Sequence, residues 1–423
     1  MRTKLNDRTW WGAALAGVAV MSWIALQGFA WNDYDTEVSA AFKSLIEGNV
    51  GGFLTQIPAY GGSLVLRAPF AGIAAALGGG ELAVYRAVSI PCLVAVAVLG
   101  IFLVRRLDGR GRSRGVRALV LGLCVVNPIT IRALEIGHPE ELLCAAFAIG
   151  ALLAAIDGRT VLAAVLLGLA IATKSWAVLA IGPVLLALPD RRVLVLAIAG
   201  GVTAAVLTPI LLAGSHGAII TGSTQTGHIF VPWQTFWFLG ESGQVVIGGN
   251  GLPKPAGYRV PPEWLSPLTH PFIAFLVVPL SLAWARVHRR ASRFGGEQLL
   301  LLLALLLLLR CILDPWNVIY YELPFLLALL AWEALCRPDR PPILALAATV
   351  IVWVTFERAP DWLSPDMQCV FFLAWSLPLA AWLACEAFRS PRALRTARTR
   401  SGGLATAALK PISPSLSSRR QAS

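Results

Sequence analysis

The segment WNDYDTEVSAAFKSLIE, residues 31–47, follows directly on an apolar run at residues 10–30. An apolar helix of about 20 residues is long enough to cross a bilayer, so the run predicts a spanning helix. The segment then places three carboxylates, those of Asp33, Asp35 and Glu37, where this helix would leave the membrane. Ionisable groups beside membrane helices are costly and usually functional, so the segment predicts a reactive site at the membrane boundary.

The composition identifies a membrane protein. The 423-residue chain is 57% hydrophobic and 14% charged, with a mean hydropathy of +0.70, values that exclude an ordinary soluble protein. Its apolar stretches are continuous, which predicts transmembrane helices. A net charge of +12 could indicate nucleic acid, but the arginines gather in short segments between apolar runs, as the positive-inside rule requires. We expect a lipid bilayer as partner and no nucleic acid.

Hydropathy and loop charge predict an all-α polytopic protein with about twelve transmembrane helices, within a range of ten to twelve, and both ends in the cytosol. The strongest inside signal is the arginine cluster at 105–117, after the second run. Residues 1–388 would form this transmembrane domain, and the arginine-rich segment 389–423 a disordered cytosolic tail. The predicted helices cover residues 10–30, 87–104, 117–133, 140–156, 161–173, 175–188, 193–213, 271–285, 298–313, 318–335, 341–356 and 367–388.

Two long loops are expected on the outer side, at residues 31–86 and 214–270. The first contains LVLRAPFAGIAAALGGG, residues 64–80, which is short for a span and carries Arg67, so it predicts an interfacial helix. Residues 161–188 allow either one helix with Lys174 at its centre or two short helices that meet there. A single helix would place the next arginines outside, so we favour the hairpin.

Most ionisable residues within or beside the predicted helices fall at the outer helix ends. Acids and bases that converge from several hairpins fit a catalytic cavity open to the outer face, whereas an ion pathway would need charges near mid-membrane and on toward the cytosol. The residues at the outer ends are Asp33, Asp35, Glu37, Arg132, Glu135, His138, Glu140, Glu141, Lys174, Arg310, Asp314 and Glu322.

Taken together, these features resemble the GT-C glycosyltransferases, most closely the polyprenol-phosphate-sugar-dependent members such as the mycobacterial-type mannosyltransferases and the protein O-mannosyltransferases. The similarity covers the first ten predicted helices. It rests on DYDTE at 33–37 followed by AAFKSLIEGN, on GLAIATKSWAVLAIGPVLLAL at 168–188 and on YYELPFLLALL at 320–330.

The resemblance implies an inverting hexosyl- or pentosyltransferase, with mannose among the candidate sugars, in a bacterial plasma membrane. Its site would face outward and move the sugar from a polyprenyl-phosphate-linked donor to a hydroxyl of a lipid or glycan acceptor. In that family an Asp of the first outer loop is the general base, a role that a carboxylate at the membrane boundary can fill. Asp33 and Asp35 both fit this role, and the sequence does not decide between them.

Cations are needed to hold the donor phosphate as it leaves, and Lys174, Arg310 and Arg132 are the candidates. Each of them could instead pair with a neighbouring acid. A single phosphate needs no metal, so no cofactor is required, although the DxD pattern leaves a divalent cation open. Further residues expected to hold the acceptor or to line the cavity are Glu37, His138, Glu140, Glu141, His228, Asp314, Tyr321 and Glu322.

The GHPEE motif at 137–141 allows two interpretations. It fits a helix start, with proline in the first turn and two glutamates favoured by the helix dipole. It also fits a site at which the histidine and a glutamate orient the acceptor, relay a proton or ligate a divalent cation.

Two other functions compete with a transferase. A transporter of the major-facilitator type also has about twelve helices, and LVRRLDGRGRSRG at 103–115 resembles its basic loop. Such transporters carry their long central loop inside, however, whereas here the long loops are predicted outside. A non-catalytic scaffold for cell-envelope assembly would not require acids and bases on one face.

Overall fold

The computed structural model describes residues 2–24, 33–58, 61–214, 230–242, 257–288, 296–337 and 340–389. Within these ranges the fold is helical, apart from one isolated bridge between Glu241 and Val260. Seven of its helices are long and apolar enough to cross a membrane. The chain is therefore an all-α multi-pass membrane protein, while the count of about twelve spans stays a prediction. The seven are Glu81–Asp108, Arg114–Ile136, Pro189–Leu212, Pro267–His288, Gly296–Leu313, Ile319–Cys336 and Pro365–Ala387.

The first half of the chain comprises α1 (Arg2–Ile24), the π-helical turn η1 (Tyr34–Val38), α2 (Ser39–Ile46), α3 (Val50–Thr55), α4 (Gly62–Ala76), α5 (Glu81–Asp108), α6 (Arg114–Val125), α7 (Pro128–Ile136), α8 (Glu140–Ile156) and α9 (Thr160–Thr173). The second half comprises η2 (Ser175–Ala180), α10 (Ile181–Ala187), η3 (Pro189–Arg191), α11 (Arg192–Leu212), η5 (Trp237–Leu239), α13 (Leu265–Phe275), α14 (Val277–His288), η6 (Gly296–Gln298), α15 (Leu299–Leu313), η7 (Ile319–Glu322), α16 (Leu323–Cys336), α17 (Ile343–Glu357), α18 (Ala359–Trp362) and α19 (Pro365–Ala387).

Most predicted helices are present with boundaries shifted by a few residues, and some are divided. The predicted helix 117–133 is split into α6 and α7 because Pro128 starts a new helix, whose first turn the Asn127 side chain caps by accepting a hydrogen bond from the Ile129 N–H. The predicted helix 271–285 is divided into α13 and α14.

The predicted outer loops are shorter than expected at their C-terminal ends. Helix α5 begins at Glu81, so the first loop ends before residue 86, and it continues through Arg105 and Arg106, which the dipole favours in a last turn. Helix α13 begins at Leu265, inside the predicted loop 214–270. The tail beyond residue 389 lies outside the described residues.

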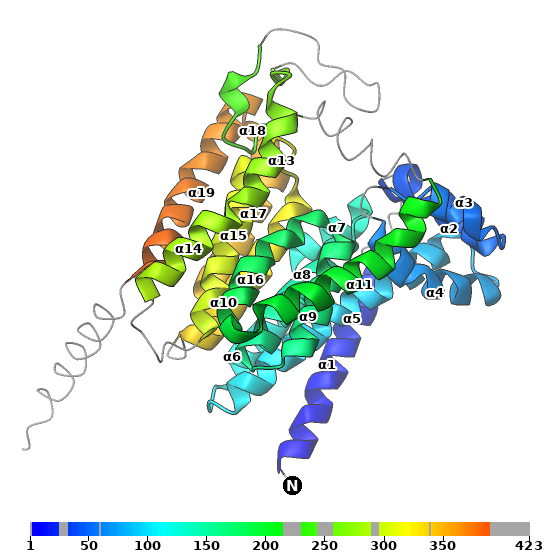
Figure 1. The fold of residues 1–423 in the computed structure, drawn as a ribbon, viewed down its shortest axis with the longest axis horizontal. Coiled ribbons are helices and arrows are strands. Elements are labelled where there is room, and N and C mark those ends of the chain that lie inside the picture. The colour runs from blue at the N-terminus through cyan, green and yellow to red at the C-terminus, as the bar shows by residue number, and fades with distance from the viewer. Residues whose placement is uncertain are drawn as a thin grey trace, which may run out of the picture.

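Helices α8 and α16 form the centre of the bundle. Nearly all their side chains are buried, which is the expected state of a helix that is apolar on every face. Helix α8 packs against α5, α9 and α16, and α15 packs against α16 and α19. By contrast, the spans Pro189–Leu212 and Pro267–His288 are largely exposed on the surface of the protein. In each of them only 17% of the most apolar 18-residue stretch is buried. These spans form an outer layer around the central helices (Figure 1).

The short helices α2, α3 and α4 lie together at one edge of the molecule, at the right in Figure 1. They share a second apolar core, in which the Tyr34 ring packs against Phe42 and Tyr85. The Tyr85 hydroxyl donates a hydrogen bond to the Leu134 carbonyl oxygen. This core fixes η1, and with it the acidic motif, against helices α5 and α7.

The chain reverses direction at Lys174, as the predicted hairpin requires. The backbone there is extended, with φ −149° and ψ 135°, and ends α9. Gly61 lies close to Ile210, near the end of α11, and its neighbour Gly62 lies close to Ala172, near the end of α9. Helices α9 and α11 therefore end on the same side of the molecule. Helix α10, which connects them, must therefore run back from Lys174, and the single-helix alternative is excluded.

The two ends of the bundle differ chemically. At one end Arg106 pairs with Asp157, which follows α8, and Arg110 pairs with Glu297, which precedes α15. We call this the arginine end. Helices α9 and α15 start there, so Lys174 and Asp314, which follow them, lie at the opposite end. We call that opposite end the Asp33 end, because Asp33 contacts His138 there, beside the start of α8.

The contact between α9 and α11 gives a test of this packing. A Cβ atom at Gly168 would lie 2.6 Å from the Ala199 carbonyl oxygen, so we expect Gly168→Ala to destabilise the protein by about 1–3 kcal/mol. Gly200→Ala is the matched control, because nothing lies within 4 Å of its Cβ position. Thermal unfolding in detergent measures both variants. Equal midpoints for the two would contradict the described helix contact.

Candidate functional site

The turn between α7 and α8 brings GHPEE against the acidic motif. Gly137 has φ +108°, a left-handed conformation that glycine adopts without strain. A Cβ atom at this position would lie 2.4 Å from the Tyr34 nitrogen. The glycine thus permits both the sharp turn after α7 and the close approach of η1. The helix-start interpretation of GHPEE is confirmed, because α8 begins at Glu140 directly after Pro139.

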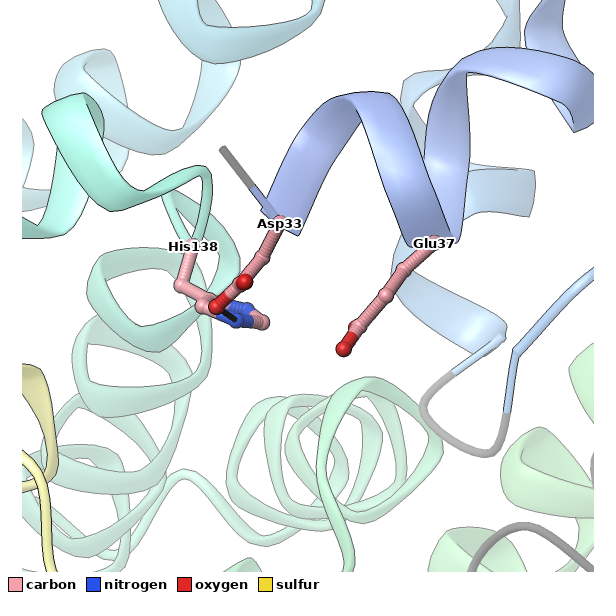
Figure 2. Close-up of side chains that lie close together, drawn as sticks. All are labelled: Asp33, Glu37 and His138. Atoms are coloured by element: carbon pink, nitrogen blue, oxygen red, sulfur yellow. Dashed lines mark hydrogen bonds and ion pairs between the residues drawn. The ribbon is translucent and has the colours of Figure 1, made fainter. Parts of the chain in front are cut away.

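His138 connects a half-exposed carboxylate to a buried one. Its Nε2 atom lies 3.1 Å from Asp33 Oδ2, and its Nδ1 atom lies 2.7 Å from Glu140 Oε1. The Asp33 side chain is 45% exposed, whereas Glu140 is fully buried. Figure 2 shows Asp33 and His138 pointing toward one another, with the Glu37 carboxylate on the same side of η1. The imidazole ring therefore contacts one carboxylate that solvent can reach and one that it cannot.

The charge environment favours the protonated form of His138, which lies in the turn between two helices. Burial lowers the pKa of the ring, but the Glu140 charge and hydrogen bonds to Asp33 and Glu140 outweigh it and raise the pKa to about 9. In the protonated ring both nitrogens donate hydrogen bonds, one to each carboxylate.

Two adjacent buried glutamates at the start of α8 gather the cations of the site. Lys174 Nζ lies 3.1 Å from Glu140 Oε1 and 3.5 Å from Glu141 Oε1. Arg67 of α4 approaches Glu140 Oε2 at 3.5 Å, and Arg310 of α15 approaches Glu141 Oε1 at 3.9 Å. Glu141 Oε2 accepts a hydrogen bond of 2.9 Å from the Trp176 indole N–H. We call Arg67, Glu140, Glu141, Lys174 and Arg310 the buried charge cluster.

The buried charge cluster contains three cations and two carboxylates, and the Asp314 carboxylate beside it interacts electrostatically with Arg310. An anion that entered the cluster would need free hydrogen-bond donors as well as nearby cations. Arg67 Nη1 is buried and has no hydrogen-bond partner within the described part of the chain. It is a donor that an additional anion can use.

A second group of polar residues adjoins the cluster through Arg310. The Arg310 guanidinium lies 4.1 Å from the Tyr321 ring centroid and donates to the Tyr321 carbonyl oxygen. Asp314, just after α15, lies 3.5 Å from His270 Nε2. The Asn317 amide donates to Glu322 Oε1 at 3.2 Å.

The predicted site residues thus separate into groups. Those that contact the buried charge cluster or belong to it are His138, Glu140, Glu141, Lys174, Arg310 and Tyr321. Asp33 contacts His138, and Asp314 and Glu322 adjoin the cluster through the groups around Arg310. Glu37 joins Asp33 and His138, because one ligand atom from each lies within 4.8 Å of the others. Arg132 is held by Glu357 and Glu135 at the side of α7. His228 lies outside the described residues.

The helical form of the acidic motif explains why Asp33 and Glu37 share a face. In a helix, residues four apart lie on one side, whereas a residue two positions away lies on another. Asp33 is the motif residue whose carboxylate contacts His138, and Asp35 follows two positions later.

Sequence reasoning missed Arg67, Trp176, His270 and Asn317. Arg67 served only to exclude a spanning helix, although a charged residue in an apolar stretch is itself a signal of a buried partner. The other three are neutral or lie in long connections, and no local pattern distinguishes them.

The structure predicts a strong stability effect at Lys174. Lys174→Met leaves Glu140 and Glu141 with less cationic compensation, and removing one partner of a buried ion pair costs about 3–5 kcal/mol. We expect a clear fall in the thermal unfolding midpoint in detergent. Lys43→Met, at an exposed lysine of α2, is the control and should change stability by less than about 0.5 kcal/mol. An unchanged midpoint for Lys174→Met would contradict the buried charge cluster.

Comparisons of the chain with protein families, with curated proteins and with solved structures find no match. The GT-C resemblance therefore stays an inference from the sequence, and the function has to be argued from the side chains of the site.

Proposed function

We propose that the protein is an inverting membrane glycosyltransferase of GT-C type. It would transfer a sugar from a polyprenyl-phosphate-linked donor to a hydroxyl group of a lipid or glycan acceptor. The observation that carries this proposal is the contact of the half-exposed Asp33 with His138, directly beside buried cations. One place thus offers a base that an acceptor can reach and positive charge for a leaving phosphate.

In the proposed reaction, Asp33 takes the proton of the acceptor hydroxyl as its oxygen attacks the anomeric carbon. The bond between that carbon and the donor phosphate oxygen breaks on the opposite face, which inverts the configuration. Because Asp33 Oδ2 is held by His138, Oδ1 is the oxygen assigned to the acceptor. Asp35 has no assigned step.

The leaving phosphate carries away the electron pair of the broken bond and needs nearby cations. We assign this role to Lys174, Arg310 and Arg67. The convergence of these three cations on Glu140 and Glu141 and the buried Arg67 Nη1 donor support the assignment. Arg132 is not assigned this role, because its partners are Glu357 and Glu135 rather than residues of the buried charge cluster.

The positive-inside rule gives the proposed orientation. The arginine end would face the cytosol of a bacterial cell and the Asp33 end the outer side of the plasma membrane, with about twelve spans and both termini inside. The donor would then reach the site within the outer leaflet.

A proton-coupled transporter of the major-facilitator type is the second candidate. The observation that favours it is the full burial of Glu140 and Glu141 beside Lys174, since intramembrane acids of this kind often relay protons. A transporter gives no new glycosidic product, so one assay separates the two functions.

The test measures transfer of radiolabelled sugar from polyprenyl-phosphate donors to membrane lipid and glycan extracts by the purified protein. We expect Asp33→Asn to lower turnover by about 10²–10⁴-fold, the usual contribution of a general base, with donor binding retained. Asp35→Asn is the matched control and should keep its activity. Unfolding midpoints of both variants exclude a general loss of fold.

Either of two results would reject this function. The first is an absence of product with every donor tested, which would bring the transporter forward. The second is equal turnover by the Asp33 and Asp35 variants, which would remove the assigned base.

A further inference from the structure

We propose that Asp33, Glu37 and His138 form a binding site for one divalent transition-metal ion, Mn²⁺ or Zn²⁺. One ligand atom from each of the three residues lies within 4.8 Å of the other two. They come from two segments that are far apart in the sequence, η1 with its preceding residue and the turn after α7. Figure 2 shows the two carboxylates and the imidazole ring facing a common space.

The distances fit an ion with only a small adjustment. Ligand atoms bound at about 2.1 Å in a tetrahedral arrangement lie roughly 3.4 Å from one another. Asp33 Oδ2 and His138 Nε2 are 3.1 Å apart, close to this value. The limit of 4.8 Å on the three separations exceeds this value by about 1.4 Å. Rotation of the partly exposed Glu37 side chain can close a gap of this size.

The surroundings of His138 provide an independent argument. Histidine ligands almost always donate their second ring N–H to a carboxylate or carbonyl, which fixes the tautomer and the ring orientation. Here Glu140, fully buried and outside the ligand set, lies 2.7 Å from Nδ1. Binding of the ion would displace the proton from Nε2, since a histidine ligand is the neutral imidazole. With the remaining proton on Nδ1, the lone pair of Nε2 is directed toward Asp33 Oδ2, where the ion would bind.

A close backbone contact also fixes the positions of the two segments relative to one another. Gly137 packs so closely on Tyr34 that a Cβ atom would lie 2.4 Å from the Tyr34 nitrogen. Asp33 and His138 are the immediate neighbours of this contact in the two segments. The separation of their side chains is therefore set by packing rather than by the ion, as in a preformed site.

The ligand types select the class of metal. An imidazole nitrogen favours Zn²⁺ and other transition metals, whereas Mg²⁺ and Ca²⁺ prefer oxygen ligands alone. Three protein ligands leave at least one coordination position for water or for a hydroxyl group. This inference goes beyond the proposed transferase activity, since the ion site stands on three side chains and can be tested without donor or acceptor.

The test is direct binding of Mn²⁺ to the purified full-length protein in detergent after chelator treatment. Electron paramagnetic resonance reports free Mn²⁺, so binding appears as loss of signal. We expect one ion per chain, displaced by Zn²⁺ but not by equimolar Mg²⁺ or Ca²⁺. Glu37→Gln should weaken binding by at least about tenfold, since metal-site substitutions of this kind commonly cost 10–100-fold. Glu47→Gln, at an exposed glutamate of the same region, should bind as the unaltered protein does.

Each contrary outcome overturns a stated part of the inference. Folded protein that binds no Mn²⁺ at millimolar concentration has no such site. Equal binding by Glu37→Gln and the unaltered protein would place the ion elsewhere, and equal competition by Mg²⁺ would overturn the metal class. Glu37 is partly exposed, so its variant should fold, which unfolding midpoints check. Because the assay uses no sugar donor, its result is independent of whether the protein is a transferase.

Discussion

The burial of the Glu140 carboxylate is the constraint on which the rest of the site depends. A fully buried carboxylate is tolerated only when cations and hydrogen-bond donors surround it, and here they come from three separate parts of the chain. His138 approaches from the preceding turn, Lys174 from the break after α9 and Arg67 from α4. Each of these contacts ties a different segment to the start of α8. The first loop, the central bundle and the acidic motif are thereby held in one arrangement.

Much of the fold could be predicted from the sequence, because a membrane helix is recognisable from a short stretch of the chain. Continuous apolar runs and the arginines between them gave most helix positions, and α8 begins and ends where predicted. The hairpin at Lys174 followed from charge alone, since a single helix would have moved later arginines to the wrong side. Boundaries were less accurate where the breaks depend on single residues, such as Pro128 within the predicted helix 117–133.

Many residues of the candidate site could be predicted from the sequence, but the contacts between them could not. His138, Glu140, Glu141, Lys174 and Arg310 could be named because charges near membrane helices are rare. Their pairing depends on helix packing, which no short-range pattern encodes. The choice between Asp33 and Asp35 was open for a related reason, because both residues fit the position of the general base and the sequence alone does not show which carboxylate faces His138. Once the turn is helical, Asp33 and Glu37 share a face.

The low burial of α11 and α14 has a consequence of a different kind. Both belong to apolar spans whose side chains mostly face away from the protein. In a bilayer, acyl chains would fill the grooves along these helices and supply the dispersion contacts that neighbouring side chains supply around α8. Lipid would then act as a structural component of the outer layer. The packing of these two helices against the rest of the protein would then depend on the thickness and the acyl composition of the membrane.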